Sequence, residues 1–252
     1  MSSFAASAPL HAGVTVIQES PTGLIALSKP VGTLSHPNEP IDERRSLLTC
    51  PYSIEGEYFE WGTVADNDHQ RVWLLNRLDS ATSGVVLLAK SEALAQVIRL
   101  HFKKRHVKKV YAALVFGRPG TNRADWLDRL STAKRGGRVR TATRGHVPAE
   151  TAMHRVESVT GKYGSLSLVQ LEPKTGRSHQ LRVQCAHRGL PIVGDATYGD
   201  FRRNRGFAKQ GGNRRLFLHS YRTSFSFEWA EQTHNFVAEA PLPPEFNVAL
   251  TT

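Results

Sequence analysis

The sequence predicts an α+β fold: a mixed, mainly antiparallel sheet with flanking helices and loops. Two observations support this class, namely the many short apolar runs of strand length and the small number of segments with helical periodicity. At 252 residues the chain can bury one sizeable core, either as one domain or as one domain with two lobes. We expect residues 1–13 to form an N-terminal extension and residues 14–252 to form the domain itself.

The first half of the chain alternates between short strands and one clear helix. Residues 91–106 predict that helix, because Ser91 is a suitable N-cap and the apolar side chains between Leu94 and Phe102 form one stripe. Residues 35–70 lose apolar periodicity, and we interpret them as a long excursion within the domain. The strands expected in this half are residues 14–17, 24–28 and 85–89.

The second half is expected to hold the remaining strands and a second helix. Residues 178–188 predict the helix, with Gly189 and Pro191 as stop signals. Residues 197–215 are interpreted as a polar, basic connection, and a short tail follows residue 229. The strands expected in this half are residues 109–116, 151–158, 165–172 and 216–229.

The charge of the chain is unusual for a soluble protein of ordinary composition. Lys and Arg number 33 against 22 Asp and Glu, so the net charge is +11 and the pI is near 10.0. Such a surplus favours a polyanionic partner, and nucleic acid is the leading candidate. Anionic lipid is less favoured, because no segment joins a basic face to a long apolar one.

Two basic segments are candidates for contact with that partner. Six of the seven residues 103–109 are basic, which is more than a helix C-terminus needs, and we interpret them as a phosphate-contacting edge. Residues 119–148 are rich in Gly and Arg. They form either a flexible solvated loop or an arm that becomes ordered on RNA, and the overall charge favours the arm.

Cysteine use and the N-terminus point to a reducing compartment. Cys50 and Cys185 are far apart and belong to no CxxC or Cys/His cluster, so neither a disulfide framework nor a metal site is expected. Residues 1–13 lack the basic and apolar regions of a signal peptide, and no apolar run is long enough to span a bilayer. We therefore expect a cytoplasmic protein that binds no membrane.

One carboxylate has a setting that suits catalysis. Asp79 lies on a hydroxyl-rich turn that ends at Gly84 and leads into the predicted buried strand, and Arg77 precedes it by two residues. A turn held by a rigid scaffold can aim one side chain at a ligand, and an aimed carboxylate can act as a nucleophile. Taken alone, the segment favours a structural turn over a catalytic one, since Asp often bonds nearby backbone donors.

Three further segments carry side chains that could join Asp79. Tyr111 could supply a ring for stacking and a phenol for proton transfer. The alternative interpretation is a structural aromatic residue of the core. Arg177 precedes a helix N-terminus, where it could pair with a carboxylate such as Asp79, or face solvent. Lys29 begins a rigid KPVG turn of the kind found near a phosphate or ribose.

Six short motifs follow one another along the chain: KPVG at 29–32, RLDSATSG at 77–84, KVYAALV at 109–115, TGRSHQLRV at 175–183, PIVGDATYG at 191–199 and LHS at 218–220. In this order they resemble the motifs of the RluA-type pseudouridine synthases, and the resemblance extends over residues 14–240. The central RLDSATSG motif and the TGR motif are the specific pair, and no segment resembles the small S4 RNA-binding domain of many relatives.

The resemblance implies an isomerase that breaks the N-glycosidic bond of a uridine in RNA, turns the base and rejoins it through carbon. It implies that Asp79 is the nucleophile, Tyr111 stacks on the uracil, and Arg177 pairs with Asp79. No cofactor and no metal are implied, and the default state is a monomer acting on rRNA or tRNA. The residues that the resemblance assigns to substrate binding are Lys29, Arg77, His179 and Gln180.

Some positions depart from the family pattern. Asn76 stands where relatives usually have His, Gln184-Cys185 replaces a usual His-Leu pair, and Ser220 replaces a usual Ala. These changes leave the proposed catalytic residues intact but weaken any transfer of a relative's RNA target.

Two other functions compete with the synthase. One is a basic RNA-binding module that retains the fold without the chemistry. The other is a glycoside hydrolase, which would need a second carboxylate. The only nearby candidate for that carboxylate is Asp195, whose Gly-Asp turn indicates a structural role instead.

Overall fold

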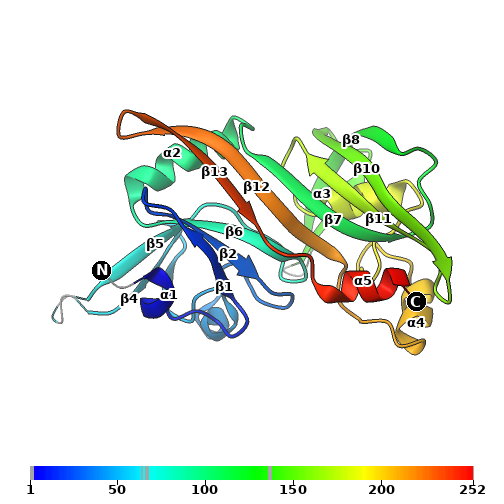
Figure 1. The fold of residues 1–252 in the computed structure, drawn as a ribbon, viewed down its shortest axis with the longest axis horizontal. Coiled ribbons are helices and arrows are strands. Elements are labelled where there is room, and N and C mark those ends of the chain that lie inside the picture. Colours follow the sequence, from blue (N-terminus) through cyan, green and yellow to red (C-terminus); the bar gives the residue numbers. More distant parts are fainter. Residues whose placement is uncertain (1–2, 64, 66–67, 136–137, 252) are drawn as a thin grey trace. The chain divides into compact units, whose positions relative to one another are not determined.

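The computed structural model describes residues 3–63, 65, 68–135 and 138–251, and they form two compact units (Figure 1). Unit 1 comprises Met1–Val107 and Arg222–Ala240, and unit 2 comprises Lys108–Tyr221 and Pro241–Thr252. The chain passes between them at residue 108 and returns along strand β12 (Leu218–Trp229). No described helix combines the length and the apolar character needed to cross a membrane.

Unit 1 is an antiparallel arrangement of strands with one long helix. Strand β6 pairs with β2 and with β5, β5 pairs with β4, and β4 with β3, while β2 also pairs with β1. Strand β13 pairs with β12. The elements are α1 (Phe4–Ser7), β1 (Thr15–Glu19), β2 (Leu24–Lys29), the 3-10 helix η1 (Pro40–Arg45), β3 (Tyr52–Ser53), β4 (Tyr58–Trp61), β5 (Gln70–Leu74), β6 (Ser83–Ala89), α2 (Glu92–Lys103) and β13 (Gln232–Glu239).

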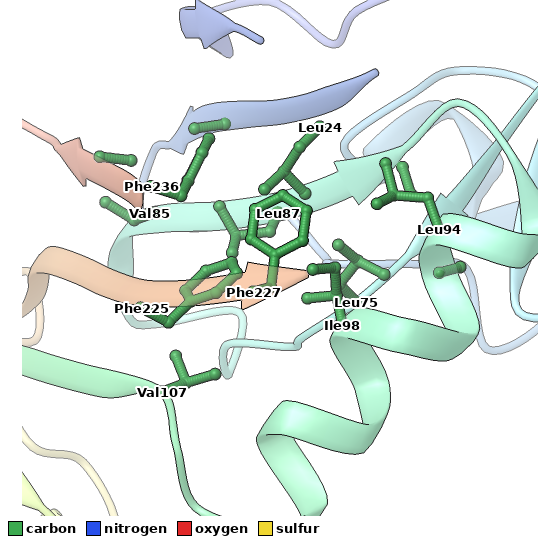
Figure 2. Close-up of a cluster of buried hydrophobic side chains, with 14 of the residues drawn as sticks. Leu24, Leu75, Val85, Leu87, Leu94, Ile98, Val107, Phe225, Phe227 and Phe236 are labelled. Atoms are coloured by element: carbon green, nitrogen blue, oxygen red, sulfur yellow. The ribbon is translucent and has the colours of Figure 1, made fainter. Parts of the chain in front are cut away.

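The core of unit 1 explains the continuous apolar run of β6. Every residue of Ser83–Ala89 is buried, because both faces of this strand are covered. Figure 2 shows Val85 and Leu87 of β6 in one cluster with Leu94 and Ile98 of α2 and with three phenylalanines of β12 and β13. The Ser91 side chain accepts a hydrogen bond from the Leu94 N–H at 3.3 Å, which confirms it as the N-cap of α2.

Unit 2 is built on a five-stranded antiparallel sheet in the order β7-β11-β10-β8-β9. Helix α3 contacts β8 and β9, where Leu130, Ala149 and Val183 form a small cluster. The elements are β7 (Lys108–Phe116), β8 (Arg123–Arg135), β9 (Arg138–Thr143), β10 (Val147–Gly161), β11 (Gly164–Pro173), α3 (Gln180–His187), α4 (Phe201–Lys209) and α5 (Pro244–Thr251). The predicted class, a mainly antiparallel sheet with flanking helices, is confirmed.

Three segments differ from the prediction. Residues 119–148 are not an irregular loop, because β8 and β9 form a long hairpin within them. Its inward residues, such as Trp126 and Leu130, are buried, but the basic side chains between them mask the strand alternation in the sequence. Gly136 and Gly137, which belong to the Gly/Arg-rich run, lie outside the described residues.

Residues 197–215 contain helix α4, which was not predicted, and the supposed tail contains β13 and α5. Helix α4 is nine residues long and buries one apolar side chain, Phe207, so it shows little apolar periodicity. Phe207 packs against Phe116 and Phe217, with ring centroids 6.3 and 5.7 Å apart. Tertiary contacts therefore stabilise a helix that the local pattern does not indicate.

Candidate active site

The predicted site residues fall into two groups, one in each unit. Lys29, Arg77 and Asp79 belong to unit 1. The residues of the second group belong to unit 2: Tyr111, Arg177, His179 and Gln180.

The turn that carries Asp79 is held on both sides of that residue. The Ser35 hydroxyl accepts from the Leu78 N–H and donates to the Leu78 carbonyl, both at 2.9 Å. On the other side, the Ser80 carbonyl accepts from the Gly32 N–H at 2.8 Å. The Asp79 carbonyl itself accepts from the Thr82 N–H at 2.9 Å. The half-buried Asp79 side chain is thus presented from a backbone that cannot shift easily.

Lys29 supplies a further support for this turn. Its side chain is completely buried. Its ammonium donates to the carbonyl oxygens of Thr33 at 2.7 Å, Pro30 at 3.1 Å and Ser80 at 3.2 Å. The last of these bonds joins the KPVG turn directly to the residue after Asp79. These contacts give Lys29 a role in positioning the turn, and its contact with RNA stays a prediction.

Arg77 lies exposed beside an aromatic pair. Its Nη1 is 3.5 Å from Nε2 of His36. The His36 ring stacks on Tyr52, with centroids 5.0 Å apart and an interplanar angle of 17°. Burial raises the pKa of Tyr52 to about 12, so its phenol is neutral near pH 7. The exposed guanidinium next to stacked rings suits the contact with a nucleotide that was predicted for Arg77.

Tyr111 occupies the first half of β7, after two lysines. It pairs with Leu171 of β11 and is half-buried. It shares a face of the strand with Ala113 and Val115, both completely buried. The strand therefore fixes the base of the tyrosine in the core of unit 2, which is the support that a stacking ring requires.

The loop before α3 presents Arg177 and is held by Gln180. Arg177 is exposed, and its Nε donates to the Pro148 carbonyl at 3.3 Å. Gln180 is only 3% exposed. Its Oε1 accepts from the Arg177 N–H at 3.1 Å and from the Thr175 hydroxyl at 2.8 Å. Its Nε2 donates to the Glu150 carbonyl and the Thr151 hydroxyl, both at 3.0 Å. These four bonds give Gln180 a role in positioning Arg177.

His179 takes part in a second network at the same loop. It has a φ of 54° and precedes α3. Its Nδ1 is 2.7 Å from the Tyr198 hydroxyl, which accepts from the Thr141 N–H at 2.9 Å. The Thr141 hydroxyl donates to the Ser178 carbonyl at 2.9 Å. The β8–β9 hairpin is thereby joined to the loop that carries Arg177.

Several supporting residues were missed from the sequence. Ser35 lies in the segment taken as an excursion, yet it bonds Leu78, which is 43 residues away. Thr141 lies in the segment taken as a loop or arm. Tyr198 belongs to the PIVGDATYG motif, which was its only signal. Contacts between segments so far apart leave no local pattern, so only the fold identifies them.

Comparison with known proteins identifies the family. Residues 23–187 match the family described as RNA pseudouridylate synthase. The chain is 37% identical over 207 residues to a Yersinia pestis protein named tRNA pseudouridine synthase C, covering 78% of this chain and 75% of the relative. The chain belongs to the RNA pseudouridylate synthase family. The RluA-type resemblance is confirmed, and with it an isomerase that converts uridine in RNA to pseudouridine.

Other relatives agree with this placement. A protein of the same name from Salmonella typhimurium is 33% identical over 239 residues, which is 90% of this chain and 85% of the relative. A solved structure titled human RNA Pseudouridylate Synthase Domain Containing 1 has a TM-score of 0.69 and 22% identity, covering 94% of this chain and 87% of that one. The likeness to this solved structure shows that the fold is that of pseudouridylate synthases. The relatives favour the enzyme over an RNA-binding module without chemistry.

Within the synthase, Asp195 is a structural residue, as predicted. It is 1% exposed, and Arg182 donates to both of its carboxylate oxygens at 2.8 Å. Burial acts to raise the pKa of Asp195, but the Arg182 guanidinium and the N–H groups of Thr197 and Tyr198 outweigh it, so the pKa is lowered. A carboxylate held in this way is not a general acid, which removes the residue that a glycoside hydrolase would need. Within the described parts of the chain, no three His, Cys, Asp or Glu side chains form a metal-binding group.

The departures from the synthase pattern fall on half-buried or buried supporting positions. Asn76 accepts from the Leu87 N–H at 2.8 Å and so extends the strand pairing up to the Asp79 turn. Gln184 is completely buried; it accepts from the Thr151 hydroxyl at 2.7 Å and donates to the Asp128 carboxylate at 2.8 Å. Cys185 is also buried, and burial raises the pKa of its thiol. These residues build the framework of the site and do not replace its exposed groups.

Proposed function

We propose that this synthase modifies uridine in tRNA, with Asp79 as the nucleophile and with Tyr111 and Arg177 as the other catalytic residues. The observation that carries the proposal is the Asp79 turn, whose backbone is fastened at Leu78 and at Ser80. An aimed, ionisable oxygen on an immobile backbone is what nucleophilic attack on a positioned sugar requires.

The chemistry needs only groups that the chain carries. The bond between C1′ and N1 of uridine breaks, the base turns, and a bond between C1′ and C5 forms. The proton on C5 is lost, and N1 gains a proton, so the reaction is an isomerisation. Tyr111 is assigned to stacking on the uracil and to proton transfer, and Arg77 to the space that the extruded base leaves. We leave open whether Asp79 attacks C1′ or the path runs through a glycal.

The choice of tRNA rests on the relatives. Two proteins of which this chain covers 75% and 85% are named tRNA pseudouridine synthase C. The net charge of +11 supports binding to a folded polyanion of that kind. Other supports are the exposed cations at Lys103, Lys104 and Arg105, and the basic residues of the β8–β9 hairpin.

We further propose that the protein is a monomer and that it works in the cytoplasm. Light scattering would test the oligomeric state, and cell fractionation would test the location.

The direct test is tritium release from RNA labelled at C5 of uridine. The purified chain is incubated with bulk tRNA and, separately, with ribosomal RNA. We expect release from tRNA alone, accompanied by pseudouridine at one or a few mapped positions. Release from ribosomal RNA alone would contradict the tRNA assignment, and no release from either RNA would refute the proposed function.

A further inference from the structure

Helix α4 in unit 2 belongs to a strongly basic segment (Figure 1). Residues 196–217 contain a single acidic residue, Asp200, whose carboxylate caps α4 by accepting from the Arg203 N–H at 2.9 Å. Six basic residues fall in the same stretch, at positions 202, 203, 205, 209, 214 and 215. The PIVGDATYG motif ends at residue 199, and none of the resembling motifs includes residues 200–217.

One face of α4 attaches it to unit 2. Phe207 packs against Phe116, Phe217 and Tyr163. Arg203 donates to the Ser165 carbonyl at 3.1 Å, and its guanidinium lies 4.4 Å from the centre of the Phe116 ring. Asn204 accepts from the Gly194 N–H at 2.8 Å. Residues 203, 204 and 207 therefore form the inward side of the helix.

The opposite face of α4 is a stripe of cations. Arg202, Arg205 and Lys209 are spaced three and four residues apart, so they lie above one another along the helix. All three are exposed, and no ion pair between any of them and another described residue occurs. Phe201, beside this stripe, is 55% exposed. We call Arg202, Arg205 and Lys209 the α4 stripe.

Helix stability explains only part of the α4 stripe. Lys209 lies in the last turn, where a cation is favourable to the helix macrodipole, but Arg202 lies in the first turn, where a cation opposes it. Like charges three or four residues apart also repel one another. An external anion would offset this repulsion and accounts for the cations that the helix itself does not need. An exposed aromatic ring next to it suits a nucleic acid, because a base can stack on the ring.

The basic surface continues onto the turn between β10 and β11. Lys162 is exposed, with its ammonium 4.8 Å from the centre of the Tyr163 ring. The Tyr163 ring packs against Phe207 with centroids 4.4 Å apart and an interplanar angle of 47°, and its hydroxyl donates to the Gln210 carbonyl at 3.4 Å. Lys162 is thus held near the C-terminal end of the α4 stripe and extends the row of positive charge.

We propose that the α4 stripe binds the sugar-phosphate backbone of the RNA substrate, at a part of the RNA other than the target nucleotide. The inference rests on the proposed function for its choice of RNA as the anion. The helix is rigidly joined to the loop that carries Arg177. Asn204 donates to the Asp195 carbonyl at 3.1 Å, Asp195 pairs with Arg182, and Arg182 belongs to α3. Phosphate contacts at α4 would therefore fix the register of the RNA on unit 2.

The test compares RNA binding by two triple variants, both carrying Asp79→Asn so that no turnover occurs. The first replaces Arg202, Arg205 and Lys209 with Gln. The control replaces Arg71, Lys90 and Arg222 with Gln, which removes the same charge from cations that are already paired with carboxylates. The dissociation constant for full-length tRNA is measured as a function of salt, and circular dichroism confirms the fold.

We expect the α4 variant to bind at least about tenfold more weakly at about 0.1 M salt, and its salt slope to fall by about 2 to 3. A third variant, with Arg202→Lys, Arg205→Lys and Lys209→Arg, keeps the charge and should retain binding. Equal weakening in the paired-cation control would overturn the proposal, because net charge alone would then explain the loss. An unchanged slope in the α4 variant would overturn it as well.

Two further measurements separate the alternatives. Vesicles containing phosphatidylserine test a lipid surface as the anion, and a loss confined to vesicle binding would overturn the proposal for RNA. Tritium release by the chain with Asp79 intact is scored independently. If tRNA is never modified, the proposed function fails whatever the α4 variant binds; if tRNA is modified while the α4 variant binds normally, only the α4 proposal fails.

Discussion

The two loops that carry the proposed catalytic groups solve one problem with different chemistry. Each presents an ionisable side chain from a segment without regular structure, and each relies on a buried polar side chain that makes several hydrogen bonds. In unit 1 the support is the Lys29 ammonium, which donates to three carbonyl oxygens. In unit 2 it is the Gln180 amide, which both donates and accepts.

The difference follows from what each loop offers. Lys29 faces only carbonyl oxygens, one on the Asp79 turn and two in and just after the KPVG turn, so a pure donor fits there, and a charged donor makes stronger bonds than a neutral one. Gln180 faces N–H and hydroxyl donors of the Arg177 loop on one side and a carbonyl and a hydroxyl of β10 on the other, so a group that both accepts and donates is needed. A buried charge costs much more to leave unsatisfied than a buried amide. The Asp79 turn therefore depends more heavily on Lys29 than the Arg177 loop depends on Gln180.

The largest expected effect is that of the catalytic group itself. Asp79→Asn should lower the rate of pseudouridine formation by about a thousandfold or more, because an amide is not a nucleophile here. RNA affinity should change little, since phosphate contacts dominate binding. Single-turnover assays and filter binding would measure the two quantities. Asp125→Asn, which alters an exposed carboxylate, is the control, and full activity of Asp79→Asn would refute the assignment.

The next largest effect is the loss of stability expected on changing Lys29, the support of the Asp79 turn in unit 1. Lys29→Met should lower the free energy of unfolding by about 3 kcal/mol, because buried carbonyl oxygens lose their donor. Urea denaturation would measure this loss. Lys90→Met, which breaks a surface pair with Glu19, should cost less than about 1 kcal/mol. If the two variants were equally stable, the dependence of the Asp79 turn on Lys29 would be wrong.

A smaller effect is expected at the exposed group of unit 2. Arg177→Lys should reduce the turnover rate by about 10- to 100-fold, since an ammonium lacks the planar, forked donors of a guanidinium. The variant also loses the Nε–H that bonds the Pro148 carbonyl. Steady-state kinetics on tRNA would measure it, with Arg144→Lys as a control at an exposed arginine. An unchanged rate would count against a catalytic role.

The smallest expected effect is the loss of stability on changing Gln180, the support in unit 2. Gln180→Glu keeps the shape of the side chain but removes its donors to the Glu150 carbonyl and the Thr151 hydroxyl. We expect a loss of about 1–2 kcal/mol in unfolding free energy. Gln96→Glu, at an exposed position of α2, loses a 3.4 Å bond to Glu92 and places two carboxylates four residues apart, which should cost only about 0.5 kcal/mol. A loss at Gln180 larger than that at Lys29 would reverse the ranking of the two supports.

Local patterns were sufficient for much of the fold. The apolar run of β6, the N-cap and stripe of α2 and the strand around Tyr111 were all predicted, because each depends on residues that are near neighbours in sequence. The turn that carries Asp79 was predicted for the same reason. The β8–β9 hairpin and α4 were not, since their charged side chains conceal the few buried residues that hold them.

The amino-acid sequence was sufficient to identify the family, the mainly antiparallel class of the fold and the candidate catalytic residues. These properties follow from short motifs and from apolar periodicity, both of which involve residues near one another in the chain. Only the tertiary structure decided how those residues are supported. Lys29 reaches Ser80 across 51 residues, and Ser35 reaches Leu78 across 43. The physical reason is that a buried polar group must find partners wherever the fold brings them, and that choice leaves no trace in the neighbouring sequence.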